Sequence, residues 1–195
     1  MTRLAHLWDM SRCIACMACM VACASANYPE HMRSEKLNPQ WRWLASNIRV
    51  WWINGDGRPR ILLTQCMQCD NAPCIHACPT GASHRDRETG LVEIDYSKCI
   101  GCKACVVACP YGARWMDPLV HMPRKCLGPE CMRRLEEGLK PVCVTVCPAN
   151  ARDFGNLDDP ESSISKRILK SAVIRLREEL GTKPRNVVVV GGDLP

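Results

Sequence analysis

The chain has 195 residues and a formal net charge of +6, with 16 cysteines but only one phenylalanine and three tyrosines. This length fits one domain or two closely joined ones, and so few aromatic residues exclude a conventional aromatic-rich core. The longest apolar runs, such as residues 187–190, are only a few residues long, which excludes a membrane span within this chain. Any membrane association must therefore come through a partner.

The cysteines fall into four groups of four, each ending with the same three-residue gap. Groups one and three have the two-two-three spacing of bacterial ferredoxins, and groups two, three and four are each followed directly by proline. The four groups are Cys13, Cys16, Cys19 and Cys23; Cys66, Cys69, Cys74 and Cys78; Cys99, Cys102, Cys105 and Cys109; and Cys126, Cys131, Cys143 and Cys147.

This spacing suits a cubane cluster, which needs four thiolates around it. A Cys-x-x-Cys-x-x-Cys turn wraps one cluster with three sulfurs, and the fourth cysteine, three residues on, ligates the other cluster in two-cluster ferredoxins. Sixteen cysteines in such groups predict four 4Fe-4S clusters.

Two other uses of cysteine compete with this one. Arg3, His6 and Asp9 interrupt the N-terminal stretch, so no secretory signal peptide is found, which argues against a disulfide scaffold. Zinc is the more serious alternative, because Cys-x-x-Cys pairs also build sites with four cysteine ligands. Zinc ribbons use two separated pairs, however, whereas groups one and three follow a three-plus-one pattern, which favours iron–sulfur clusters.

The positive formal charge does not indicate a nucleic-acid partner once the metal is counted. Sixteen ligating thiolates and four cores of roughly +2 each add about −8, so the loaded protein has a net charge near −2. The lysines and arginines are expected to compensate for the charge of the clusters, and no nucleic-acid partner is expected.

The groups predict an α+β fold of two interleaved ferredoxin-like modules. Residues 66–114 hold groups two and three around a short alternating strand at 91–94, and form an inserted module. Groups one and four flank this module in sequence, so they can form a second one only by meeting in space. The outer module therefore comprises residues 1–65 and 115–155.

Within the outer module, residues 48–63 predict a β-hairpin. Residues 48–53 are rich in β-branched and aromatic side chains, 54–57 read Asn-Gly-Asp-Gly, and 60–63 return. Four tryptophans cluster here, at positions 41, 43, 51 and 52. Neighbouring residues of a strand point to opposite faces, so we expect one of Trp51 and Trp52 to point inward, and the tryptophans to pack over the clusters.

The C-terminal residues 156–195 predict a helix and a strand. Apolar residues at helical spacing run from Ile164 to Leu180, after the start signal at Asp158, and Gly181 is a stop signal. Residues 186–190 predict a final strand. We expect this segment to form a structural strap across the ferredoxin core and to carry no site.

A resemblance to a known family follows from these motifs. The stretch Cys99–Arg114, with Cys78-Pro-Thr-Gly-Ala before it, resembles the four-cluster iron–sulfur subunits of molybdopterin oxidoreductases, such as the dimethyl sulfoxide, polysulfide, thiosulfate and tetrathionate reductases. The resemblance covers Arg12 to about Gly155. Group four departs from the family, with four residues between Cys126 and Cys131 where two are common.

The resemblance implies that group one pairs with group four, and group two with group three. The implied ligand sets are Cys13, Cys16, Cys19 and Cys147 for cluster I; Cys23, Cys126, Cys131 and Cys143 for cluster II; Cys66, Cys69, Cys74 and Cys109 for cluster III; and Cys78, Cys99, Cys102 and Cys105 for cluster IV. Cluster I is expected nearest a catalytic subunit, and cluster IV nearest the membrane.

The function implied by the resemblance is electron transfer. Such a subunit relays electrons between a molybdopterin catalytic subunit holding molybdenum or tungsten and a quinone-linked integral membrane anchor, and catalyses no reaction itself. The chain is then expected at the membrane through its partners, during anaerobic respiration. The alternative is the electron-carrying subunit of a soluble formate dehydrogenase or hydrogenase complex. The identity of the large subunit that co-purifies would discriminate between them.

Overall fold

The computed structural model describes residues 2–36, 45–55 and 58–193. The mixed α+β fold predicted from the sequence is confirmed. None of the described helices is both long and apolar enough to cross a membrane. In chain order the elements are β1 (Leu4–Asp9), α1 (Ala18–Asn27), α2 (Pro29–Arg33), β2 (Arg49–Gly55), β3 (Arg58–Thr64), α4 (Pro73–His76), β4 (Ser83–Arg85), β5 (Val92–Ile94), α5 (Ala104–Val107), β6 (Trp115–Met116), β7 (Pro123–Arg124), α6 (Pro129–Glu136), α7 (Val142–Thr145), β8 (Arg152–Asn156), α8 (Ser163–Leu169), β9 (Ser171–Ile174), the 3-10 helix Glu178–Leu180, and β10 (Val187–Asp193).

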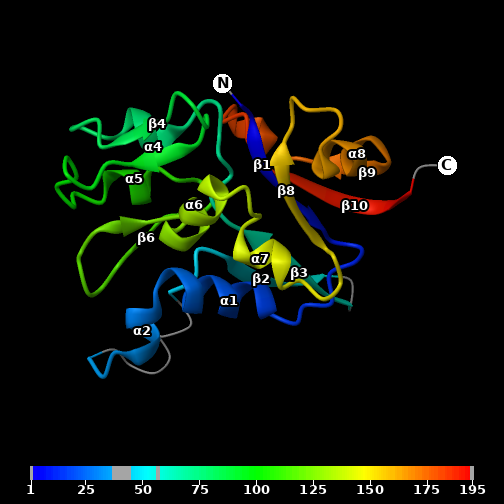
Figure 1. Cartoon of the computed structure of the whole chain (residues 1–195), viewed down its shortest axis with the longest axis horizontal. Coiled ribbons are helices and arrows are strands. Elements are labelled where there is room, and N and C mark those ends of the chain that lie inside the picture. Colours follow the sequence, from blue (N-terminus) through cyan, green and yellow to red (C-terminus); the bar gives the residue numbers. More distant parts are fainter. Residues whose placement is uncertain (1, 37–44, 56–57, 194–195) are drawn as a thin grey trace.

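A four-stranded sheet with the order β8-β1-β10-β9 lies at one end of the molecule (Figure 1). The first and last strands, β1 and β10, pair in parallel at its centre, and β8 and β9 pair antiparallel on either side. Strand β1 is not predicted from the sequence, because residues 5–9 are all buried and a strand buried on both faces lacks the alternation of polar and apolar residues.

Short elements carry the cysteine groups. Helices α4, α5 and α7 each have four residues and contain cysteines, and three two-stranded sheets lie outside the large one. Helix α4 packs against α5, and α1 packs against α6 and α7. The second of these contacts brings group one, on α1 and the loop before it, next to group four, which lies more than a hundred residues later in the sequence.

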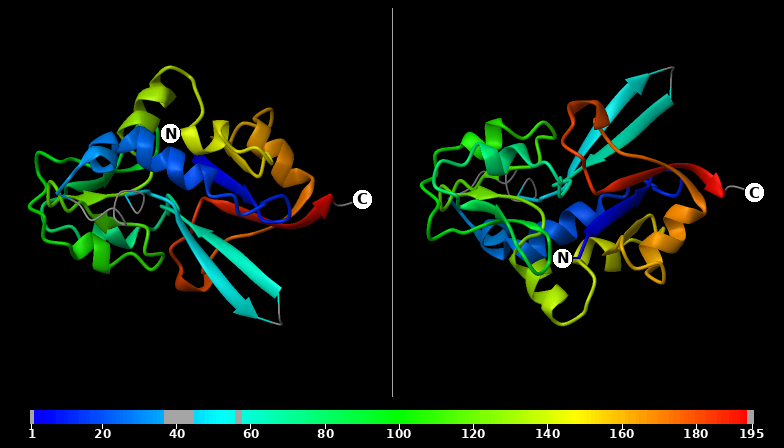
Figure 2. Two further views of the ribbon diagram at one scale, coloured as in Figure 1. Left: turned by 90° about the horizontal axis from the view of Figure 1, so that it is seen from below. Right: turned by 90° about the horizontal axis from the view of Figure 1, so that it is seen from above.

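The predicted hairpin is confirmed, with β2 and β3 pairing antiparallel so that Trp51 lies opposite Leu62 and Trp52 opposite Ile61. The hairpin projects from the body of the molecule (Figure 2). Trp51 and Trp52 are therefore both exposed, by 51% and 61%, and the expectation that one would point inward over the clusters is wrong. At these two positions both faces of the hairpin meet solvent. Trp41 and Trp43 lie outside the described residues.

The predicted helix from Asp158 to Leu180 is wrong in length. Helix α8 ends at Leu169, and residues 171–174 form β9, which places Val173 opposite Val189 of β10. The sequence Ala-Val-Ile offers β-branched side chains that suit a strand, and its pairing with β10 overrides a helical spacing that extends further along the chain. The predicted final strand is confirmed as β10.

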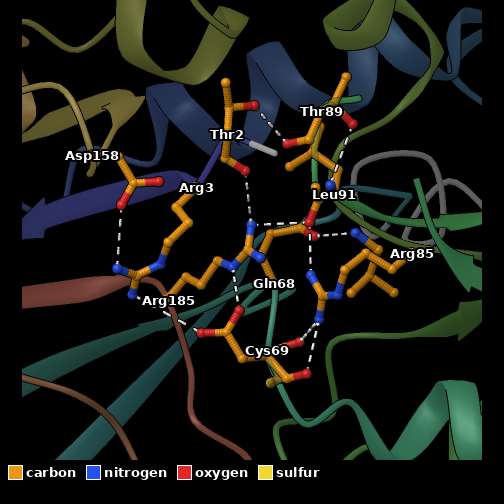
Figure 3. Close-up of polar contacts among 12 residues, drawn as sticks. Thr2, Arg3, Gln68, Cys69, Arg85, Thr89, Leu91, Asp158 and Arg185 are labelled. Carbon is orange, nitrogen blue, oxygen red and sulfur yellow. Dashed lines mark hydrogen bonds and ion pairs between the residues drawn. The ribbon is translucent and has the colours of Figure 1, made fainter. Parts of the chain in front are cut away.

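The C-terminal segment before β10 lies along the loop of group two (Figure 3). The backbone N–H groups of Asp70 and Asn71 donate to the carbonyls of Lys183 and Thr182, at 2.9 and 3.0 Å. The Arg185 guanidinium donates to Asp70 Oδ1 at 2.7 Å and to the Gly90 carbonyl at 2.9 Å. These bonds hold the Cys66–Cys69 turn in place from outside.

Helix α8 packs on the sheet through Ile164, which is fully buried with Ala5, Leu7, Val187 and Val189. We predict that Ile164→Ala leaves a cavity costing about 2–5 kcal/mol, which lowers the apparent thermal midpoint by roughly 5 °C or more in an anaerobic scan at fixed rate. Leu169→Ala is the matched control on the same helix, because Leu169 is 76% exposed. Equal midpoints for the two variants would contradict this packing.

Candidate metal centres

Two of the four predicted cysteine sets each line a cavity. One cavity is lined by Cys13, Cys16, Cys19 and Cys147, beneath Val50 and Leu63 of the hairpin. The other is lined by Cys78, Cys99, Cys102 and Cys105. Each cavity thus gathers three cysteines of one group and the last cysteine of another, as expected for clusters I and IV.

Of the remaining eight cysteines, seven are buried. Asn27 on α1 joins groups one and four, because its Nδ2 lies 3.8 Å from Cys23 Sγ and 3.6 Å from Cys131 Sγ. In the other set, burial, together with the neighbouring Cys66, Cys74 and Cys109, raises the pKa of the Cys69 thiol to about 12. Cysteines within the set expected for cluster II are therefore neighbours in space, and so are cysteines within the set expected for cluster III.

The cysteines differ in their exposure to solvent. Cys16 and Cys102 are the two exposed cysteines, and all sixteen lie within the described residues. They occupy equivalent positions, each as the second cysteine of a two-two-three group, and each follows an exposed isoleucine, Ile14 or Ile100. The four cysteines expected for cluster II are all buried. The cysteines are thus most exposed at two points, Cys16 and Cys102.

Left-handed residues shape the cysteine turns of groups one and three. Ala15 and Met17 flank Cys16 with φ of 56° and 61°, and Gly101 and Lys103 flank Cys102 with φ of 68° and 66°. Alternating backbone conformations of this kind turn successive N–H groups toward one point, which makes an anion-binding concavity used at Fe–S sites. A left-handed backbone at alanine, methionine or lysine costs conformational free energy. Its presence beside Cys16 and Cys102 is explained if the turn forms such a concavity.

Backbone donors reach the cysteine sulfurs as well. The N–H groups of Asn47, Ser83 and Ala151 donate to the sulfurs of Cys23, Cys78 and Cys147, each at 3.3 Å. Hydrogen bonds to sulfur are one of the determinants of cluster potential. Burial raises the pKa of the Cys23 thiol to about 12, so this thiol needs a metal to become a thiolate near neutral pH.

The spacing of the sulfurs argues against zinc. Among the described residues, the three side chains whose ligand atoms all lie within 4.8 Å of one another are Glu30, His31 and Asp117, and no set of three cysteines meets that limit. A tetrahedral zinc site with Zn–S bonds of about 2.3 Å brings its sulfurs to about 3.8 Å from one another. The cysteine sets therefore suit a larger inorganic core, such as a cubane, and the residues present fit four 4Fe-4S clusters.

Four buried side chains beside the cysteines are not predicted from the sequence. His6 on β1 places Nε2 3.5 Å from Cys126 Sγ, and the Lys125 ammonium donates to the Cys126 carbonyl at 3.1 Å. Arg114 donates to Cys74 Sγ at 3.2 Å, and Arg152 lies beside Cys19 and Cys143. One feature of the sequence could have pointed to the two arginines, because each lies five residues after the last cysteine of a group.

The comparisons with known proteins agree with this chemistry. The profile of the 4Fe-4S dicluster domain family matches residues 59–157, and a second profile of the same description matches residues 12–82. A polysulfide reductase subunit of Wolinella succinogenes is 38% identical over 93% of this chain and 91% of its own length. Protein NrfC of Escherichia coli is 40% identical over 91% and 76%. Thiosulfate reductase electron transfer subunit PhsB of Salmonella typhi is 40% identical over 88% and 84%.

The chain is thus a 4Fe-4S dicluster protein, with two such domains and sixteen cysteines for four 4Fe-4S clusters. It belongs to the family of iron–sulfur electron-transfer subunits that includes this polysulfide reductase subunit, NrfC and thiosulfate reductase PhsB. The resemblance seen in the sequence is confirmed, and so is the number of clusters.

Removing the clusters should unfold the chain, because the buried thiols and buried guanidinium groups around them would lose their partners. Anaerobic treatment with ferricyanide and EDTA should abolish the cooperative thermal transition seen by near-ultraviolet circular dichroism. EDTA alone, which does not oxidise the clusters, is the control and should leave the transition in place. A cluster-free chain that keeps its transition at the original temperature would contradict this dependence.

Proposed function

We propose that this chain relays electrons along four clusters, between a molybdopterin catalytic subunit and a quinone-linked membrane anchor. When bound, each 4Fe-4S cluster accepts and gives up one electron. The protein's part is to fix the order of the clusters, to enclose the middle of the row and to leave both ends accessible. This division between cofactor chemistry and protein positioning is general for electron-transfer proteins.

Exposure of the cysteines is the observation that carries this proposal. Cys16 and Cys102 are exposed, while the cysteines proposed for cluster II are buried. Exposed apolar side chains surround the two open points, with Ile14 at one end and Ile100 and Val107 at the other. Electrons can then enter at one partner and leave at another, while the enclosed clusters avoid side reactions with solvent.

The ligand sets proposed for clusters I to IV are those implied by the sequence resemblance. Support comes from the two end cavities, from the packing of α1 on α7 and of α4 on α5, and from Asn27, which links the sulfurs of groups one and four. On the same grounds we propose that residues 66–114 form a module inserted within an outer one, and that residues 156–195 strap the core.

The proposed partners follow from the relatives. The polysulfide reductase subunit and thiosulfate reductase PhsB are named as parts of larger reductases, which favours the membrane-linked respiratory complex over a soluble formate dehydrogenase or hydrogenase complex. We assign the Cys16 end to the catalytic subunit and the Cys102 end to the membrane anchor. The chain reaches the membrane only through that anchor.

Ligand crossing can be tested with one pair of variants. Cys109→Ser should perturb the cluster held by Cys66, Cys69 and Cys74, although Cys109 is the last cysteine of group three in sequence. Cys99→Ser is the matched variant in the same group, and should perturb cluster IV instead. Electron paramagnetic resonance (EPR) of the reduced complex would show a different signal altered in each case. The same signal altered in both would contradict the crossed ligand sets.

Electron flow along the row can be tested in the purified complex. Cys102→Ser should disable cluster IV and abolish quinol-coupled turnover, while the catalytic subunit keeps its activity with an artificial dye that reduces it directly. Glu136→Gln, an exposed change on α6, should leave both activities unchanged. Quinol-coupled turnover at the wild-type rate, with the cluster IV signal missing, would show that electrons take another route.

A further inference from the structure

A short motif recurs after the last cysteine of groups two, three and four. Each copy reads cysteine, proline, any residue, glycine or asparagine, and alanine, and its fourth residue is left-handed, with φ between 47° and 69°. The fifth residue after each cysteine is buried. These residues are Ser83 after Cys78, Arg114 after Cys109, and Arg152 after Cys147. The same turn is thus made three times, and each time the residue directly after the alanine points into the protein.

Arg114 lies between the cysteines proposed for clusters III and IV. Its Nη2 donates to Cys74 Sγ at 3.2 Å and to Ser83 Oγ at 2.6 Å. The Ser83 N–H in turn donates to Cys78 Sγ at 3.3 Å. Arg114 also lines the cavity of cluster IV. Burial alone would lower the pKa of Arg114, but the thiolates of Cys74, Cys66 and Cys105 raise it on balance. One guanidinium group therefore lies against both ligand sets.

Arg152 has the same place between clusters I and II. It lines the cavity of cluster I, and one of its terminal nitrogens donates to Gln65 Oε1. Burial by itself would lower the pKa of Arg152, but the thiolates of Cys143 and Cys19 raise it on balance. Cys19 belongs to the set proposed for cluster I and Cys143 to the set for cluster II.

Both arginines hold donors that no described residue satisfies. Nε and Nη1 of Arg114 and Nε and Nη1 of Arg152 are buried without a hydrogen-bond partner. A guanidinium group stays protonated in proteins, and a buried charge without a partner is strongly unfavourable. The partner must therefore be negative and must lie inside the cysteine array, which is where the clusters and their thiolates would be.

We propose that Arg152 and Arg114 are potential-setting residues, each shared by two neighbouring clusters: Arg152 by clusters I and II, and Arg114 by clusters III and IV. Reduction adds one negative charge to a cluster, and a fixed positive charge nearby, in a medium of low dielectric constant, stabilises the reduced form. Each arginine should then raise the reduction potential of both clusters beside it.

Sharing one cation also affects electron transfer within each pair. When an electron passes between the two clusters, one is oxidised and the other reduced by one electron, no proton moves and no bond changes. The charge around the shared guanidinium is then the same before and after the step. The arginine therefore stabilises an electron on either cluster of the pair, and it does not oppose electron transfer from one cluster to the other. The internal repeat supplies one such cation to each ferredoxin-like module.

This role rests on the proposed ligand sets, so the experiment identifies each cluster first, by the EPR signal that its Cys→Ser variant alters. Redox titration of the whole complex, followed by EPR, then compares Arg152→Gln with Arg114→Gln. Arg152→Gln should disfavour reduction of clusters I and II at least tenfold, a fall of 59 mV or more for a one-electron couple, and leave III and IV unchanged. Arg114→Gln should do the reverse.

Two further variants separate charge from structure. Arg133→Gln removes an exposed arginine that pairs with Glu130 on α6, and should shift no cluster. Arg152→Lys and Arg114→Lys keep the charge, and should keep all clusters with reduction equilibria within about threefold of the wild type. They also decide the matter if a Gln variant fails to assemble, because loss of the flanking clusters in the Lys variant as well would overturn the role proposed for the charge.

The outcomes distinguish this inference from the proposed function. Gln variants whose four potentials are unchanged, or shift equally, would overturn the role of the arginines while crossed ligation and the relay remain. Alternatively, the EPR signal altered by Cys109→Ser could belong to neither cluster III nor cluster IV. The proposed ligand sets would then be wrong, and so would the assignment of each arginine to its pair of clusters.

Discussion

The bonds between iron and cysteine sulfur are the interaction on which the rest of this structure depends. A chain with one phenylalanine cannot fold around an aromatic core, and the cysteines occupy much of its interior. In the ligand sets that we propose, each group supplies three sulfurs to one cluster and its fourth, three residues on, to another, so that segments far apart in sequence would be joined through metal. The packing of α1 against α7 and the pairing of the first strand with the last bring such distant segments together. We expect neither contact to persist without the clusters.

Local features of the chain could be predicted from the sequence, because short-range chemistry sets them. The two-two-three cysteine spacing, the Asn-Gly-Asp-Gly turn of the hairpin and the final β-branched strand each act within a few residues.

Features that depend on residues far away in the sequence could not be predicted in this way. Strand β1 has no alternation because both of its faces are buried, and β9 interrupts the expected helix because β10 lies beside it. Trp51 and Trp52 are expected on opposite faces with one of them buried, but both are exposed because β2 and β3 project from the body. Arg114 and Arg152 point inward because of the turn that precedes each of them. The sequence alone does not show that these turns bring the two arginines beside the cysteines.

Charge and exposure together describe how such a chain could conduct. Negative clusters in a row repel one another's electrons, and burial in the middle of the protein strengthens that repulsion. The chain counters it with buried positive and polar groups beside the cysteines: Arg152, Arg114, Lys125 and the N–H donors to sulfur. These buried groups agree with the expectation that basic residues compensate for the charge of the clusters. Where Cys16 and Cys102 reach the surface, the partners that we propose would complete the enclosure.

Anomalous diffraction at the iron absorption edge, from crystals of the loaded complex grown without oxygen, tests the central claim most directly. Our account predicts four iron clusters in one row, with cluster I against Cys147 as well as group one, cluster III against Cys109 as well as group two, and a guanidinium group within each outer pair. Fewer than four iron clusters, or a cluster held by all four cysteines of group one or of group three, would contradict it.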